Sequence, residues 1–255
     1  MTFHMVAFSE AMVTGNTFAS VTPVPDPTVT INGDNLLVMD RYNQLFAAAG
    51  FGTTGSVVTN IQVQTPSLRE MFFPNITPSV VGVTFNGLPA TTEFFDNPIP
   101  LETNEGLQVW SDASSAATAG QQGSLIMLSD GARKPITSTR IFTMRTTAAI
   151  TQVASTWVNG SLTFNQTLPV GWYEIVGMRA EASGLLGARL VFVGESAVTR
   201  PGCPGSATAQ SMDNYNYRMG RLGTWGKFHS LTPPSIDVIG TSGTSQVIYL
   251  DLIAR

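Results

Sequence analysis

Two stretches of the sequence read alike although they lie half a chain apart: FFDNPIPLETNEGLQVWSDASSAATAGQQGSLIMLSD (residues 94–130) and FHSLTPPSIDVIGTSGTSQVIYLDLI (residues 228–253). Each runs from an aromatic residue through a proline-containing link, an alternating strand and a loop of small residues to a second strand. The first matching strands begin at positions 107 and 236, 129 residues apart, and the second at 125 and 247, 122 residues apart. Two units are too few for a solenoid. The echo therefore predicts two copies of one β domain, in residues 1–137 and 138–255.

The rest of the chain has the composition of β-strands and turns. Short segments rich in Val, Ile, Phe, Trp, Tyr and Thr are bounded by Gly, Pro, Asn or Asp. In LPVGWYEIVGMRA (residues 168–180), Pro169 and Gly171 predict a turn, and an almost uncharged run follows. Many segments alternate with period two, as half-buried strands do. Strands this numerous predict a sandwich, barrel or jelly roll.

Helices are expected at one or two places only. GDNLLVMDRYNQLFAAAG (residues 33–50) has Asp34 or Asn35 as a possible cap and Gly50 as a stop. Its apolar residues at near-helical spacing are Leu37, Tyr42, Leu45 and Phe46. This pattern predicts a helix of about three turns near residues 35–49. A second, weaker helical pattern lies at SLREMF (residues 67–72).

The composition is weakly charged. Charged residues make up 12% of the chain, against roughly 25% in ordinary soluble domains, and Ser, Thr, Asn, Gln and Gly replace them. A surface with so few charges is poorly protected against association, which suits a protein packed against copies of itself. The net charge is −4 and no run of Lys and Arg occurs, so we expect no direct nucleic-acid binding.

Motifs for catalysis, cofactors and metals are weak. GFGTTG (residues 50–55) matches the dinucleotide fingerprint in letters, but a predicted helix precedes it and a strand-like segment follows, which reverses the required order. His4 and His229 are the only imidazoles, and Cys203 is the single cysteine. We expect a buried, inert Cys203 and a His229 that caps or packs at a strand edge. The prediction is no catalytic set, no cofactor and no metal site.

Carboxylates leave an enzymatic alternative open, because glycosidases need two acids in one cleft. The candidate pairs are Glu93 with Asp96 and Glu102 with Glu105, all in Pro- and Asn-rich loops. Glu174 is the one acid inside the strand of residues 172–178. We expect Glu174 to point to the polar face or to pair with an Arg.

The segment from Thr199 to Phe228 is long and has little periodicity, and loops of this length are usually functional or disordered. It is rich in Tyr, Trp and Arg, the residue types that dominate protein interfaces. The candidate subunit-interface residues, with Trp172 from the strand above, are Trp172, Arg200, Tyr215, Tyr217, Arg218, Arg221 and Trp225.

The N-terminus lacks the basic region and apolar core of a signal peptide, and no apolar stretch approaches the ~20 residues that span a bilayer. We therefore expect a soluble product folded in the cytoplasm.

In its two β halves, its Ser/Thr-rich surface and its lack of a basic arm, the chain resembles the double jelly-roll major capsid proteins of icosahedral, often membrane-containing, viruses. The resemblance covers the whole chain, and no short motif carries it. It implies an all-β fold of two tandem jelly-roll (β-sandwich) domains and a homotrimer of hexagonal outline in a capsid lattice. It also implies a place in the virion, assembly in the host cytoplasm, and as partners other capsid proteins, such as a pentameric vertex protein, and an internal membrane.

Three other classes stay open. A carbohydrate-recognising β-sandwich, such as a phage fibre tip, would use Trp110, Trp172, Trp225 and nearby Tyr as stacking platforms. A glycan-cleaving enzyme would depend on Glu174. A non-viral structural assembly, such as a surface layer or filament, would share the weakly charged exterior.

Overall fold

In the computed structural model, the described backbone comprises residues 2–11, 18–52, 58–70, 80–82, 91–113, 120–131, 136, 138, 140–194, 199–206 and 215–255. Within these ranges the side chains of residues 59, 70, 80–82, 113 and 215 are not described.

The described chain is almost entirely β, as predicted, and its strands fall into two sets. The elements of the first half are β1 (Phe3–Ala11), β2 (Ala19–Val21), β3 (Ile31–Asn32), β4 (Asn35–Leu37), β5 (Gln44–Gly52), β6 (Val58–Gln64), α1 (Pro66–Glu70), β7 (Val80–Gly82), β8 (Thr92–Glu93), β9 (Ile99–Pro100), β10 (Gly106–Ala113) and β11 (Gln121–Ser129).

The second half contributes nine strands and a short 3-10 helix. They are β12 (Phe142–Ala148), β13 (Val158–Ser161), β14 (Thr163–Phe164), β15 (Trp172–Glu181), β16 (Leu185–Val191), β17 (Gly202–Pro204), η2 (Tyr215–Tyr217), β18 (Gly226–His229), β19 (Ser235–Gly240) and β20 (Gln246–Ala254).

The strand order of the second half is that of a jelly roll. One sheet runs β14-β12-β20-β15-β18 and the other β13-β19-β16-β17. Apart from the short β14, the strands taken in chain order therefore occupy positions 1-8-3-6 in one sheet and 2-7-4-5 in the other. The first and last strands of the half lie side by side, because β12 pairs with β20 over its whole length.

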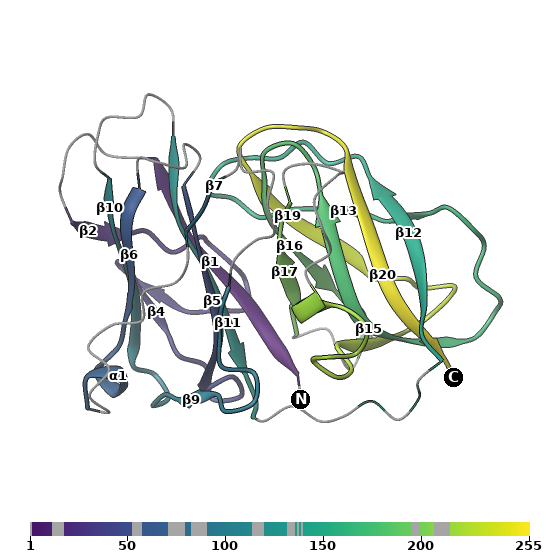
Figure 1. The fold of residues 1–255 in the computed structure, drawn as a ribbon, viewed down its shortest axis with the longest axis horizontal. Coiled ribbons are helices and arrows are strands. Elements are labelled where there is room, and N and C mark those ends of the chain that lie inside the picture. Colours follow the sequence, from purple (N-terminus) through teal and green to yellow (C-terminus); the bar gives the residue numbers. More distant parts are fainter. Residues whose placement is uncertain are drawn as a thin grey trace.

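The first half repeats this arrangement. Its order β1-β11-β5 corresponds to β12-β20-β15, and β2 and β6 flank β10 as β13 and β16 flank β19. The strands of the sequence echo take equivalent places, because β10 matches β19 and β11 matches β20. The chain is thus two tandem jelly rolls, and Figure 1 shows them side by side along the long axis of the molecule.

The sheets of the first jelly roll use residues 3–129 and those of the second use residues 142–254. The boundary between residues 137 and 138 falls in the connection, part of which lies outside the described residues, and stays a prediction.

The predicted helix near residues 35–49 is wrong. This segment forms β4, a short bridge between Met39 and Tyr42, and β5. The physical reason is burial of β5 on both faces: Leu45 and Ala48 enter the first core, whereas Phe46 and Ala47 enter a second cluster. A strand buried on both sides reads as a continuous apolar run, which spacing alone does not distinguish from a helix.

The weaker helical pattern at 67–72 is confirmed by α1, although residues 71 and 72 lie outside the described chain. In GFGTTG, Gly50 to Gly52 end β5, so a strand and not a helix precedes the motif, and residues 53–55 are not described. Within the described residues, no helix is long and apolar enough to cross a membrane.

Candidate assembly interface

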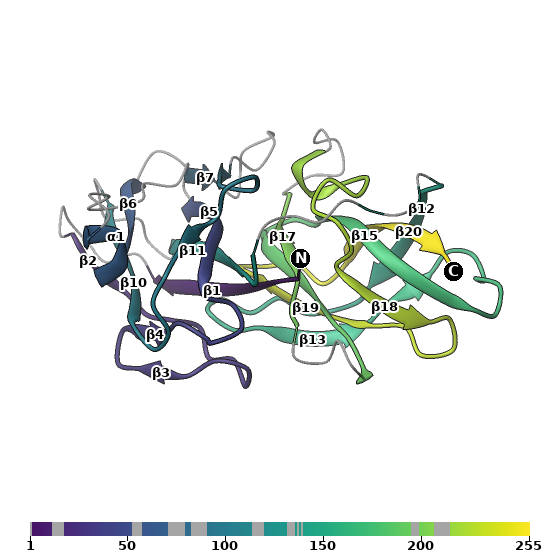
Figure 2. The ribbon, with the colours of Figure 1, turned by 90° about the horizontal axis from the view of Figure 1, so that it is seen from below.

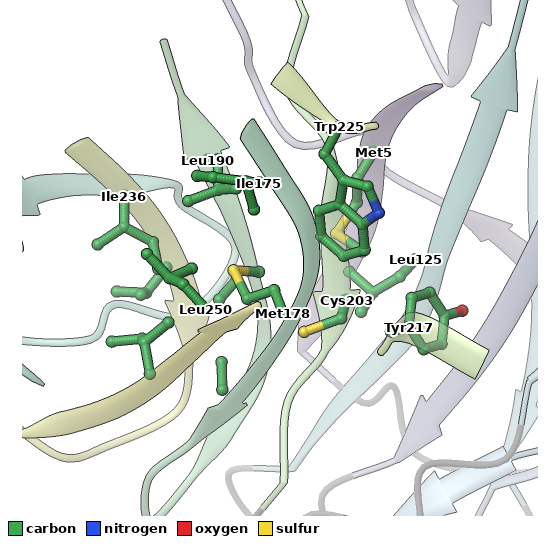
Figure 3. Close-up of a cluster of buried hydrophobic side chains, with 14 of the residues drawn as sticks. Met5, Leu125, Ile175, Met178, Leu190, Cys203, Tyr217, Trp225, Ile236 and Leu250 are labelled. Carbon is green, nitrogen blue, oxygen red and sulfur yellow. The ribbon is translucent and has the colours of Figure 1, made fainter. Parts of the chain in front are cut away.

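The two jelly rolls share one hydrophobic cluster. On β1, Val6 and Phe8 belong to the core of the first sandwich, whereas Phe3, Met5 and Ala7 belong to a cluster that continues into the second half. The same division holds on β11, where Leu125 and Met127 face the second half. Figure 3 shows Met5 and Leu125 beside Cys203, Tyr217 and Trp225 of the second half. The outer face of the sheet β1-β11-β5 is therefore a buried domain interface.

The partner of this face is the outer face of the sheet β13-β19-β16-β17. A Cβ on Gly187 of β16 would lie 2.8 Å from the Leu125 side chain, so glycine allows β16 to approach β11 closely. Trp225 completes the contact with its ring edge-on to Phe3, at 5.0 Å between centroids.

A buried ion cluster lies in the same interface. The Arg189 side chain, 1% exposed, donates to the carboxylates of Asp26 and Asp237, the latter at 3.0 Å, and to the Met5 carbonyl at 2.9 Å. Its guanidinium lies 4.1 Å from the centre of the Trp157 ring. Asp26 belongs to the first half and Asp237 to the second, so one arginine joins both jelly rolls.

His4 packs beside this cluster and is fully buried. Its Nε2 lies 3.8 Å from Asp26 and 3.1 Å from the Thr28 hydroxyl, and its Nδ1 has no hydrogen-bond partner among the described residues. Burial lowers the pKa of His4, Asp26 opposes this shift and Arg189 adds to it, with a net pKa below the ordinary 6.5. The imidazole is thus neutral at pH 7.

Asp26 remains ionised because its neighbours stabilise the charged carboxylate. Burial acts to raise the pKa of its carboxyl, but the nearby His4 ring, the charge of Arg189 and the hydrogen bonds from Thr28 outweigh burial. They hold the pKa well below its usual range. The cluster therefore combines a neutral histidine with charged Asp26 and Arg189.

Three of the predicted subunit-interface residues lie inside the chain. Trp225 and Tyr217 are each 1% exposed and belong to the shared cluster, and the Tyr217 hydroxyl contacts Thr91 of the first half at 3.2 Å. Arg218 is 6% exposed and donates to Asp251, which is fully buried, at 2.7 Å. These three side chains join parts of one chain. The prediction of a subunit interface is therefore kept for Trp172, Arg200, Tyr215 and Arg221 only.

Arg200 and Arg221 also contribute to the domain interface. The Arg200 carbonyl accepts from the Met5 amide at 2.8 Å. The exposed Arg221 guanidinium lies 3.4 Å from Glu93 of the first half. The side chain of Tyr215 lies outside the described residues.

Trp172 is the predicted residue that stands most clearly on the surface, at 58% exposed. It pairs with His229 across β15 and β18, and the two rings meet edge-on at 5.4 Å. The two strands are also joined beyond this pair by the hydrogen bonds between Gly171 and Ser230, and the adjoining Val170 and Leu231 are 76% and 71% exposed. This exposed apolar patch, Val170, Trp172 and Leu231, is placed where a partner can cover it.

The other chemical candidates have structural roles. Glu174 is 2% exposed and accepts from Arg255 at 2.6 Å, which confirms that it pairs with an arginine. Cys203 is buried, as predicted, and burial raises the pKa of its thiol to about 12. Within the described chain, no three or more His, Cys, Asp or Glu side chains gather to hold a metal.

The strand order and the shared core define a double jelly-roll protein. No family model matches the sequence, and no curated protein matches it. Among solved structures, the chain is similar to the major capsid protein P2 from bacteriophage PM2, with 10% identity and a TM-score of 0.25 over 99% of this chain and 97% of that one. It is also similar to the STIV MCP, with 8% identity and a TM-score of 0.27 over 97% and 96% of the two chains.

Proposed function

We propose that this chain is a structural coat protein that assembles into trimers and then into an icosahedral shell. One observation carries the proposal: two jelly rolls of the same strand order are joined into a single block by a shared apolar core and the buried Arg189 cluster. Such a block supplies two similar tiles per chain, so that three chains supply six and give a nearly hexagonal outline.

The way in which the two tiles meet supports a ring. The contact joins two different faces, the outer face of the first sheet in one jelly roll and the outer face of the second sheet in the other. Head-to-tail contacts of this kind close into rings when the rotation between units allows it. A mostly uncharged exterior, with 12% charged residues, favours coverage by further copies.

The remaining assignments follow from this role. The protein would reside in the virion after assembly in the host cytoplasm, with further copies of itself as its main partner. A pentameric vertex protein and an inner membrane are candidate partners, and direct binding to nucleic acid is not expected. The boundary between residues 137 and 138 would separate the two jelly rolls, each of which forms one tile of the shell.

Native mass spectrometry of the purified chain over a range of concentrations tests the proposal. Trimers, or closed shells built from them, are the expected species. A monodisperse monomer at the highest concentrations would overturn the proposal.

A second candidate function, carbohydrate recognition, rests on one specific observation. Phe18 and Trp110 stack at 5.5 Å on the outer face of the first jelly roll, and Trp110 donates to Gln108 at 3.1 Å. Aromatic rings with amide groups beside them suit sugar rings. A glycan array probed with the purified chain tests this function, and binding that Trp110→Ala removes would favour it.

A further inference from the structure

A polar pocket opens on the outer face of the first jelly roll, next to the stacked pair Phe18 and Trp110. Its volume is about 240 Å³, and its lining includes Asn35, Gln64, Thr65, Arg69, Gly106 and Gln108. In both views the elements that form it, β4, β6, α1 and β10, lie at the end of the long axis away from the second jelly roll (Figures 1 and 2). The domain contact inside the chain therefore does not cover the pocket.

We propose that this pocket and the neighbouring aromatic pair bind an acidic sugar, whose ring carries a carboxylate. The inference rests on carbohydrate recognition, the second candidate function, and names the class of its ligand. All the residues involved belong to one chain, so binding does not require a trimer.

Gln108 connects the aromatic pair to the pocket. Gln108 and Trp110 are two residues apart on β10, so their side chains emerge on the same face, roughly 7 Å apart. Across the strand pair they lie opposite Gln64 and Gln62 of β6. A sugar ring that packs its C–H groups against the aromatic pair can therefore extend its substituents into the pocket.

A hydrogen bond from Trp110 turns the Gln108 amide so that its N–H groups stay available. The Trp110 indole N–H donates to Gln108 Oε1 at 3.1 Å. An indole N–H can only donate, so the oxygen of the amide must face Trp110. Within the described residues Gln108 Nε2 has no hydrogen-bond partner, and its two N–H groups can donate to an oxygen of a ligand.

Arg69 on α1 supplies a positive charge at the pocket. Its exposed guanidinium donates to Gln64 Oε1 at 3.2 Å, and no carboxylate among the described side chains forms an ion pair with it. Glu105 is not part of the lining, because its carboxylate accepts from the Ser67 amide at 2.9 Å. One guanidinium beside an amide donor matches a carboxylate, which carries one charge, better than a phosphate, which carries nearly two.

The pocket is small. Drug-sized ligands occupy sites of about 300–1,000 Å³, so a pocket of about 240 Å³ fits a single sugar ring better than a larger ligand. A Cβ at Gly106 would collide with the Asn35 side chain, so glycine keeps this part of the pocket open.

A glycan array tests the ligand class when it carries acidic glycans beside the same glycans with their carboxyl groups reduced to alcohols. The chain should bind acidic members and prefer them to their reduced forms. The dissociation constant of the best acidic glycan is then measured by titration calorimetry for the wild type, Arg69→Gln and Trp110→Ala. Arg145→Gln is the matched control, because it removes an exposed arginine from the second jelly roll.

Arg69→Gln should weaken binding of the acidic glycan by about tenfold or more, the effect of losing one charge-assisted hydrogen bond. It should also abolish the preference over the reduced form. Arg69 is exposed, so the variant should fold normally. Arg145→Gln should bind like the wild type.

Equal binding of the acidic and reduced forms, or an unchanged affinity of Arg69→Gln, would overturn the inference. If Trp110→Ala still removed that binding, carbohydrate recognition would stand without the acidic class, whereas no binding to any glycan would overturn both. Native mass spectrometry of the same sample separates these results from the coat role. Trimers that bind no acidic glycan would overturn only the inference, and monomers that bind one would overturn only the coat role.

Discussion

The two jelly rolls have the same strand order but opposite outer faces on their equivalent sheets. On the first jelly roll, β1 and β11 present Met5, Ala7 and Leu125, all buried against the second. On the second, β12 and β20 present Arg145 and Tyr249, which remain accessible. The fold sets where a face lies, and the outward residues of its strands decide whether that face is permanently buried or available to another molecule.

The largest effect is expected at Arg189, which is buried between the two jelly rolls. Arg189→Ala leaves Asp26 and Asp237 without their shared cation, and loss of one partner from a buried ion pair costs about 3–5 kcal/mol. Chemical denaturation of the full chain measures the loss. The control Arg145→Ala, on the exposed face, should change stability by no more than about 0.5 kcal/mol. Equal effects of the two changes would contradict the distinction between the faces.

A second loss of stability is expected from the apolar part of the domain interface. Leu125→Ala opens a cavity opposite Gly187, and such substitutions cost about 2–5 kcal/mol. The same denaturation experiment measures it, with Val170→Ala, at a 76% exposed residue, as the control. A loss below about 0.5 kcal/mol for Leu125→Ala would mean that the two jelly rolls do not pack as described.

A smaller effect should appear when the pH is lowered. The pKa of His4 in the folded chain lies below its ordinary 6.5, so the folded state binds this proton less well than the unfolded state. Stability from neutral His4 is fully present above pH 6.5 and is lost as the pH falls through the folded pKa. Because glutamine cannot titrate, His4→Gln should make stability depend less on pH between pH 6.5 and about 4.5. This range lies above 3.8, the ordinary pKa of an aspartate, so protonation of carboxylates contributes little within it. If His4→Gln left the dependence of stability on pH unchanged, His4 would not be the cause of the loss at low pH.

The smallest effect on folding is expected at Trp172. Trp172→Ala removes an exposed ring and should alter stability by no more than about 0.5 kcal/mol. If the patch is a subunit contact, the same change lowers the fraction of chains in trimers, measured by native mass spectrometry. Normal trimers of this variant would remove Trp172 from the proposed interface.

Much of the fold can be predicted from the sequence because it depends on local pattern. The alternation of apolar and polar residues identifies β10 and β20. The strands of the sequence echo take equivalent places in the two jelly rolls, since β10 matches β19 and β11 matches β20. The error at β5 has a physical cause, since Phe46 and Ala47 face a neighbouring domain that the local pattern does not reveal.

The interface was harder to predict because its contacts join distant residues. Arg189 and Asp26 lie 163 residues apart in sequence, and neither stands in a motif. Aromatic and arginine content predicts a subunit contact for residues 199–228, whereas the buried Tyr217 and Trp225 pack against the chain's own first half. Composition indicates that such residues make contacts, but only the fold shows whether the partner is a domain or another molecule.

Negative-stain electron microscopy of the concentrated protein tests the central claim most directly. If two joined jelly rolls per chain form a coat tile, the class averages should show hexagonal particles with six lobes, two from each of three chains. Isolated two-lobed particles of one chain at every concentration would contradict the account.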